Sequence, residues 1–322
     1  MIFNQELTKS YFEHMLTIRY VEEALADEWD KGLVPGMLHL ACGHEAVAVG
    51  VACQLNNHLD QITASHRGHG AAIAIGVPLV PMISEVLGLN GLNGGFGGTQ
   101  HIASPKHGFL TANGIVGGQV PLAAGAALSA KIQKTGGIAV TFLGDGAINQ
   151  GCVLETLNLA KILSLPLLFV IEDNGMGATI GSAYSTAGEI ENRARAVNMQ
   201  SYSVDGADIL AVVDTATQAV ASVRSGGGPA MIVARVKRLD GHYYSDPQNY
   251  RSPQEFKQAR EHHDPIERLS SVMMTMGWSL TERNHIEHRV KARITQAVEQ
   301  AHLCPQTDEQ YLAFNVYGGV AS

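Results

Sequence analysis

Cysteine is rare in this chain of 322 residues, which contains four of them. They are Cys42, Cys53, Cys152 and Cys304, and no two of them form a Cys-x-x-Cys pair. This usage argues against a disulfide framework and is typical of reduced thiols that pack in a protein interior. Residues 1–30 carry acidic side chains throughout and lack the apolar core of a signal peptide, so we expect a cytoplasmic protein.

Charged side chains and long apolar runs are also scarce. Charged residues make up 16% of the chain, and the net charge of −8 argues against a nucleic-acid partner or an anionic membrane surface. No apolar run approaches the roughly 18 residues that a membrane-spanning helix needs. Hydrophobic residues reach 45%, which suits a globular core, and the length fits one large α/β domain or two smaller ones.

Glycine is abundant, and the most informative glycines enclose an aspartate in Gly144-Asp145-Gly146. The apolar run 138–143 precedes them and predicts a buried parallel strand. A helix-like stretch follows, and a second apolar run, 167–171, leads into Asn174. Both strands of such a strand–helix–strand unit end at the same edge of the sheet, so we expect Asp145 and Asn174 to meet there.

The chemistry of this pair suits a divalent cation that bridges a phosphate. Carboxylate, amide and main-chain oxygens are ligands that magnesium accepts, and phosphate oxygens and water complete its octahedron. Gly144 and Gly146 let the backbone approach a diphosphate closely, and the following helix start offers free N–H groups. A tight turn without a ligand is the alternative, because Asp-Gly pairs are common in turns. The second strand ending in Asn174 favours the metal site.

Other segments extend this pattern to the whole chain. Further strand-like runs at 60–64 and 230–236 also end in polar segments, which begin at Ser65 and Lys237. Helices are expected over 6–31, 43–54, 121–134 and 149–163, and in a C-terminal region that starts at Pro265 and is interrupted near Gly277. We predict an α/β fold with a doubly wound, mostly parallel sheet and helical N- and C-terminal extensions. It would form a single domain over 1–322, with a core at about 35–260 and a C-terminal helical region at about 265–322.

These motifs together resemble one family. Gly144-Asp145-Gly146 through Asn174 is similar to the thiamine-diphosphate signature. The segments 39–46, 65–70, 113–121 and 241–247 resemble the alpha subunit of the thiamine-dependent first component of 2-oxo-acid and acetoin dehydrogenase complexes. The similarity runs from about residue 10 to 270 and is pyruvate-dehydrogenase-alpha-like overall. The short length of the chain and the sequence of the 66–70 segment favour an acetoin-dehydrogenase-type alpha subunit. The resemblance implies a thiamine-diphosphate-binding fold.

The resemblance also implies roles for eleven residues. Magnesium would be held by Asp145, Asn174 and the main-chain oxygen of Met176. The diphosphate would contact the amides of Gly146 and Ala147 and the side chains of His66 and Arg67. The aminopyrimidine would meet main-chain oxygens of Gly114 and Val116. His242 would lie near the terminal phosphate and the reacting carbon, and His39 would face the substrate. Taken singly, each of these histidines is more often a structural group than a catalyst.

The activity implied by the resemblance is that of a heteromeric oxidoreductase. Thiamine diphosphate and magnesium would support cleavage of the C–C bond next to a carbonyl, in a 2-oxo acid or acetoin, and the acyl group would pass to a lipoyl acceptor. A separate beta subunit would supply the glutamate that activates the cofactor, in a heterotetramer of two alpha and two beta subunits. A lipoyl acyltransferase would be a further partner.

Five positions depart from the family pattern and leave the substrate open. They are Asp173, Phe96, Gln100, Asp240 and Tyr243, of which Tyr243 stands where mitochondrial relatives carry a phosphorylated serine. One alternative is a stand-alone carboligase of two subunits that makes acyloins, and another is a non-catalytic scaffold subunit of the same fold. A Rossmann-type nucleotide-binding module is disfavoured because no Gly-x-Gly-x-x-Gly follows the first strand.

Overall fold

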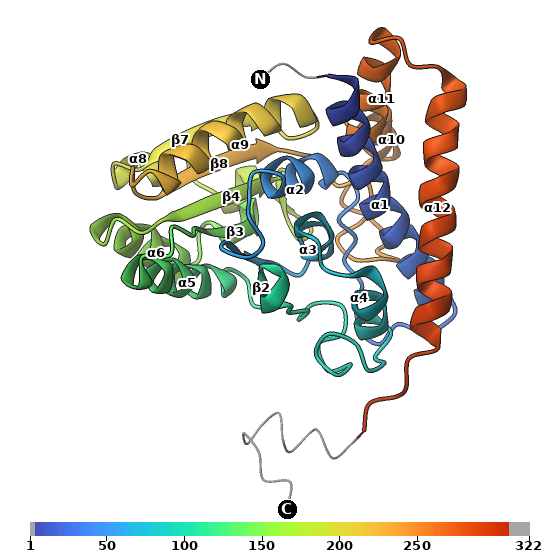
Figure 1. Cartoon of the computed structure of the whole chain (residues 1–322). Coiled ribbons are helices and arrows are strands. Elements are labelled where there is room, and N and C mark those ends of the chain that lie inside the picture. The colour runs from blue at the N-terminus through green and yellow to red at the C-terminus, as the bar shows by residue number, and fades with distance from the viewer. Residues whose placement is uncertain (1–3, 309–322) are drawn as a thin grey trace, which may run out of the picture.

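The computed structural model describes residues 4–308 and is built on a six-stranded sheet whose neighbours all run parallel. The strand order is β2-β1-β3-β4-β8-β7 (Figure 1). The strands are β1 (Gln61–Ala64), β2 (Phe109–Ala112), β3 (Ala139–Gly144), β4 (Leu167–Asp173), β7 (Gln200–Asp205) and β8 (Ala230–Arg235). The expected α/β class with a parallel sheet is confirmed.

The central strands form where the chain is apolar on both faces. Strands β3, β4 and β8 are buried along almost their whole length, as expected for strands covered by helices on each side. Strand β7 lies at the edge, and its sequence Gln-Ser-Tyr-Ser-Val-Asp is polar and mostly exposed or half-buried. Because an edge strand does not need a continuous apolar run, β7 could not be predicted from its apolar pattern.

Helices cover both faces of the sheet. One face packs against α5 (Gln119–Gln133), α6 (Gly151–Ile162) and α8 (Glu191–Ala196), and the other against α2 (Glu45–Ala52), α3 (His69–Ile75) and α9 (Ile209–Arg224) (Figure 1). Alternate residues of β4 serve the two faces: Phe169 joins the core under α5 and α6, whereas Val170 joins the core under α2 and α9. The doubly wound arrangement is therefore confirmed.

The first and last helices lie side by side at one end of the molecule (Figure 1). Helix α1 (Gln5–Asp30) packs against α11 (Pro265–Thr275) and α12 (Leu280–His302), and α12 also contacts α4 (Leu79–Val86). Gly277, at φ +94°, breaks the chain between α11 and α12 as expected. Buried residues of α1 and α12 belong to the same core cluster as the residues under α2 and α9. The single domain, with its core at about 35–260 and its C-terminal helical region at about 265–322, stays a prediction, and residues 309–322 of that region lie outside the described residues.

Short elements complete the fold around the carboxyl ends of the strands. After β4 the chain forms a small antiparallel hairpin of β5 (Met176–Gly177) and β6 (Ile180–Gly181), followed by α7 (Ser182–Ser185). The loop after β8 leads to α10 (Pro253–His262), which begins with a capping box at Ser252. Among the helices of residues 4–308, none is long and apolar enough to cross a bilayer.

Candidate active site

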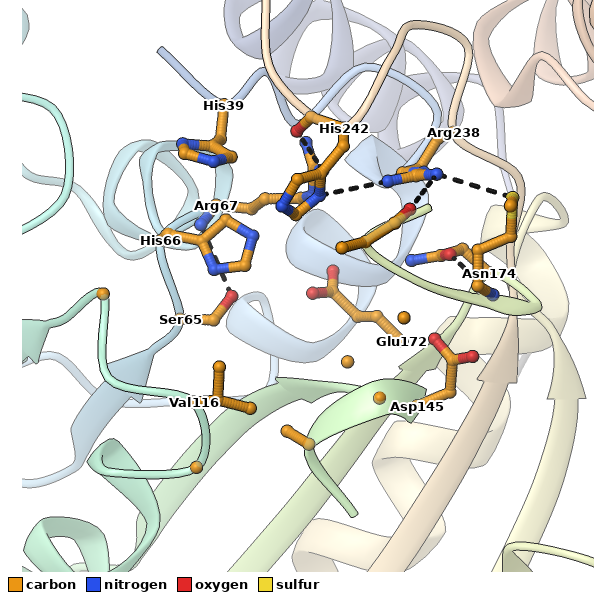
Figure 2. A pocket seen from close by; sticks show the side chains of 18 of the residues that line it. His39, Ser65, His66, Arg67, Val116, Asp145, Glu172, Asn174, Arg238 and His242 are labelled. Carbon is orange, nitrogen blue, oxygen red and sulfur yellow. Dashed lines mark hydrogen bonds between the residues drawn. The ribbon is translucent and has the colours of Figure 1, made fainter. Parts of the chain in front are cut away.

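A cavity of about 390 Å³ lies at the carboxyl ends of the parallel strands. All eleven residues singled out from the sequence border it, and Figure 2 shows several of them facing one another. They are His39, His66, Arg67, Gly114, Val116, Asp145, Gly146, Ala147, Asn174, Met176 and His242. The structure therefore brings the expected set together, while the individual roles stay predictions.

Asp145 begins the turn after β3 and is 1% exposed. Its Oδ2 atom accepts a hydrogen bond from Ser182, whereas Oδ1 is buried and has no hydrogen-bond partner among the described residues. Burial, and to a smaller extent the charge of Asp173, raises the pKa of Asp145. A buried carboxylate oxygen without a partner is unfavourable, and a bound cation would satisfy it. Asp145 thus has the properties of a metal ligand.

The Asn174 segment is held against the Asp145 turn by glycines. Asn174 Oδ1 accepts a hydrogen bond of 3.1 Å from the Met176 amide, which turns the chain into the β5–β6 hairpin. A Cβ atom on Gly146 would lie 2.9 Å from the Cα of Gly177, so only glycine permits this approach. The two loops that carry the predicted oxygen ligands are therefore in direct backbone contact.

Two arginines, Arg67 and Arg238, converge on His242, and neither forms an ion pair with a carboxylate of residues 4–308. Arg67 is 9% exposed and donates from Nη1 to Leu40 O (2.6 Å) and from Nη2 to His242 O (2.6 Å). Arg67 Nη2 and Arg238 Nη1 lie 3.3 and 3.2 Å from His242 Nδ1. Burial, followed by the charge of Arg238, lowers the pKa of Arg67 to about 10. This pair of guanidinium groups offers a binding site for an anion such as a diphosphate.

Three histidines lie beside the arginines. The ring centroids of His39, His66 and His242 are 4.5, 5.1 and 5.5 Å apart. Burial, followed by the charge of Arg67, lowers their pKa values to about 3, 2 and 4. The rings are therefore neutral at pH 7. Because guanidinium groups only donate, His242 Nδ1 accepts and the proton of this ring is on Nε2.

The opposite wall comes from the segment between β2 and α5. Gly114, Ile115 and Val116 border the cavity, and the side chains of Ile115 and Val116 are 70% and 52% exposed. Gln100 packs against this wall, because a Cβ atom on Gly114 would lie 2.4 Å from Gln100 Oε1. Of the five departures from the family pattern, Gln100 alone borders the cavity.

Asp173 and Asp240, the two acidic residues that depart from the family pattern, pair with arginines outside the cavity. Asp173 forms an ion pair of 2.7 Å with Arg235 and does not border the cavity. Asp240 forms one of 2.5 Å with Arg260 on α10. Neither carboxylate is placed among the cavity residues, although Asp173 still contributes to the raised pKa of Asp145.

Three cavity features were not predicted. Glu172, at the end of β4, is 7% exposed and borders the cavity (Figure 2). Its Oε1 atom lies 3.2 Å from His44 Nδ1. The alternation of a strand places it on the same side as Asn174, so this signal was present in the sequence. Arg238, from the loop after β8, borders the cavity and contacts His242. Ser182 binds Asp145 from a segment that has no distinctive pattern.

Comparisons with known proteins agree with this geometry. The family model for the dehydrogenase E1 component matches residues 13–310. The acetoin:2,6-dichlorophenolindophenol oxidoreductase alpha subunits of Bacillus subtilis (strain 168) and Cupriavidus necator are 41% and 38% identical, over 95% and 98% of this chain and 92% and 95% of theirs. The pyruvate dehydrogenase E1 alpha subunit of Zymomonas mobilis is 35% identical, over 98% of this chain and 90% of its own.

The chain belongs to the dehydrogenase E1 component family, whose members use thiamine diphosphate and magnesium. Within that family it is an alpha subunit of the E1 component, and thus part of an oxidoreductase. The resemblance found in the motifs is confirmed, and a Rossmann-type nucleotide-binding module is excluded.

Proposed function

We propose that the cavity binds thiamine diphosphate and magnesium, and that the chain acts with a beta subunit to cleave the C–C bond next to a carbonyl and pass the acyl group to a lipoyl acceptor. The substrate is acetoin or a 2-oxo acid, as in the names of the relatives. The observation that carries this proposal is the buried Oδ1 of Asp145, which no described residue contacts by a hydrogen bond. It lies in a cavity that also contains Asn174 and two arginines that form no ion pair with a carboxylate in the described part of the chain.

The residues of the metal corner fit the cofactor. Asp145 Oδ1, the Asn174 amide oxygen and the Met176 main-chain oxygen would hold magnesium. The amides of Gly146 and Ala147, with Arg67 and Arg238, would hold the diphosphate, and Gly114 and Val116 would hold the aminopyrimidine through their main-chain oxygens. Bound thiamine diphosphate supplies a nucleophilic carbon and a sink for the electrons of the broken bond.

The histidines would bind the substrate. As neutral rings they can donate to, or accept from, substrate oxygens without a net charge of their own. His242 presents an Nε2–H group that is fixed by the contacts of Nδ1 with the two arginines. The ring centroids of His39 and His66 lie 5.1 and 5.5 Å from that of His242. His39 and His242 would therefore orient a carbonyl oxygen beside the cofactor, while His66 would lie beside the diphosphate together with Arg67.

A beta subunit would cover the open side of the cavity. Ile115 and Val116 are exposed at its edge, and the outer faces of α5 and α6 expose further large apolar side chains, which include Leu122 (48%), Ile132 (70%) and Ile162 (68%). Apolar groups exposed over two adjacent helices favour a protein partner. The names of the relatives, which are alpha subunits, support a beta-subunit partner. We propose that it assembles with this chain as a heterotetramer of two alpha and two beta subunits.

The test is to purify the chain alone and as an assembly with its beta subunit, and to saturate both with thiamine diphosphate and magnesium. Turnover of acetoin and pyruvate is followed with an artificial electron acceptor. We expect activity only from the assembly, together with magnesium-dependent cofactor binding. Robust turnover by the isolated chain would contradict the division of roles. Acyloin formation without any lipoyl acceptor would instead support a stand-alone carboligase.

A further inference from the structure

Ser182 connects the two loops that carry the predicted magnesium ligands. Its hydroxyl donates a hydrogen bond to Oδ2 of Asp145, in the turn after β3. Its backbone amide donates a hydrogen bond of 2.9 Å to Gly175 O, which lies between the predicted ligands Asn174 and Met176. A single residue at the start of α7 therefore contacts both loops of the metal corner.

The hydroxyl makes the two carboxylate oxygens of Asp145 unequal. Oδ2 accepts the hydrogen bond from Ser182, whereas Oδ1 is buried and has no hydrogen-bond partner among the described residues. The bond also fixes the rotation of the carboxylate group, because turning both oxygens toward one cation would distort it. The carboxylate is therefore oriented to bind a cation through Oδ1 alone.

Magnesium and calcium differ in how they use a carboxylate. Magnesium requires a near-octahedral shell of oxygens at about 2.0–2.1 Å. Calcium accepts about six to eight oxygens at roughly 2.3–2.6 Å in a flexible geometry, and it often takes both oxygens of one carboxylate. A carboxylate that is held in a one-oxygen orientation thus suits magnesium and removes an advantage of calcium.

We propose that Ser182 is a positioning residue that makes the metal corner selective for magnesium over calcium, by holding Asp145 in a one-oxygen binding geometry. The hydroxyl acts through Asp145 and does not itself bind the cation. This inference rests on the proposed function, because it concerns the cation of the same site.

The position of Ser182 does not depend on its own hydroxyl. Helix α7 is also held by Asn149, whose Nδ2 donates to Ser185 O and to Thr186 Oγ1, both at 2.9 Å. Arg193 in turn donates from Nη2 to Asn149 Oδ1 at 2.9 Å. Removing the Ser182 hydroxyl should therefore leave the helix in place and free the carboxylate that it holds.

The experiment titrates magnesium or calcium into the chelator-treated assembly with its beta subunit, in the presence of thiamine diphosphate, and follows binding by calorimetry without substrate. In Ser182→Ala we expect the affinity for magnesium to fall about tenfold, because the carboxylate loses its orientation. The affinity for calcium should fall by no more than about twofold, or rise, because both carboxylate oxygens become available. Ser182→Thr keeps the hydroxyl and should keep the preference for magnesium.

Ser185→Ala is the matched control. Ser185 lies on the same short helix, is exposed, and its side chain forms no hydrogen bond with the described residues. It should leave both affinities unchanged. Equal losses of magnesium and calcium affinity in Ser182→Ala would show that the hydroxyl only stabilises the metal corner, and would overturn the proposal. A preference of the unmodified assembly for calcium would overturn it as well.

The same titrations separate this inference from the proposed function. If neither cation promotes binding of thiamine diphosphate to the unmodified assembly, the metal site itself is wrong and the inference fails with it. If magnesium promotes binding and Ser182→Ala keeps the full preference for magnesium, only the role of Ser182 is wrong. Cofactor binding through Asp145 and Asn174 then stands.

Discussion

The two ends of the cavity are built in different ways. The metal corner comes from the ends of adjacent strands, where the register pairs Gly144 with Glu172 and so fixes Asp145 relative to Asn174. The histidine cluster instead comes from three segments far apart in the sequence: the chain before α2, the end of β1 and the loop after β8. The sheet therefore fixes the geometry of the metal corner, whereas the geometry of the histidine cluster depends on how three loops pack together.

This difference makes the metal corner sensitive to small substitutions and lets the histidine cluster vary more freely. The metal corner uses backbone contacts and one buried carboxylate, so small substitutions there should have large effects. The histidine end uses side chains whose charge and hydrogen bonding can change without altering the sheet. We expect cofactor binding to be determined at the first end and substrate choice at the second, and the following predictions test that division.

The largest effect is expected for Asp145→Asn. The variant keeps the shape of the side chain but removes the charge that would hold magnesium, so magnesium-dependent affinity for thiamine diphosphate should fall by at least about 100-fold. The apoprotein should keep or gain stability, because burial raises the pKa of Asp145 and makes its ionised form unfavourable in the fold. Calorimetry on the assembly measures the affinity.

Asp173→Asn is the control for this change. Its carboxylate pairs with Arg235 rather than bordering the cavity, so its effect on magnesium affinity should be small. Equal losses in the two variants would mean that the general negative charge near the corner, and not ligation by Asp145, attracts the metal.

The next effect tests the backbone contact. In Gly146→Ala the added Cβ would lie 2.9 Å from Gly177 Cα, so the hairpin must move, and the free energy of unfolding should fall by about 1–3 kcal/mol. Cofactor affinity should fall with it. Gly144→Ala is a matched control, since its Cβ would meet nothing within 4 Å. Denaturant unfolding measures the free energy of unfolding of both variants. A loss in Gly146→Ala alone indicates a steric effect, whereas equal losses in both variants indicate a general requirement for glycine.

The histidine cluster should make the stability of the protein depend on pH. His39 and His242 have pKa values of about 3 and 4 in the fold and about 6.5 when unfolded. Below pH 6.5 the unfolded chain binds more protons, so stability is fully present above this pH and is lost as the pH falls toward 4. The free energy of unfolding should fall by at most about 1.4 kcal/mol per pH unit for each histidine. The contribution of His242 should be smaller because its side chain is only partly buried. Unfolding at pH 7, 6 and 5 should show a shallower slope in His39→Asn than in the unmodified chain.

A smaller effect is expected in the loop over residues 237–251. Arg238 lowers the pKa of the Arg67 side chain, so the two cations oppose each other unless an anion lies between them. A bound diphosphate would relieve this repulsion and favour the ordered loop. Hydrogen exchange of the segment should slow when thiamine diphosphate and magnesium are added. Equal exchange in both states would show that internal bonds such as those from Arg251 to Arg238 O and Asp240 O already fix the loop.

The sequence predicted the metal corner better than the histidine end. Apolar runs define β3 and β4, and parallel topology then places Asp145 beside Asn174 without further information. The direction of Asp173 and Asp240 away from the cavity could not be predicted, because it depends on Arg235 and Arg260 from other segments. The orientation of the Gln100 amide likewise depends on Met37 and Gly114, which only the tertiary structure brings together.

The packing of α1 against α11 and α12 has a consequence for synthesis on the ribosome. Helix α1 is made first, yet Arg19 forms an ion pair with Asp264 (3.0 Å) and Arg293 donates to Thr17. These contacts form only after nearly the whole chain has emerged. During translation the apolar side of α1, which includes Phe12 and Met15, therefore lacks part of its final cover. We expect nascent chains stalled before α11 to bind chaperones that hold exposed apolar helices, and to release them once α12 is complete.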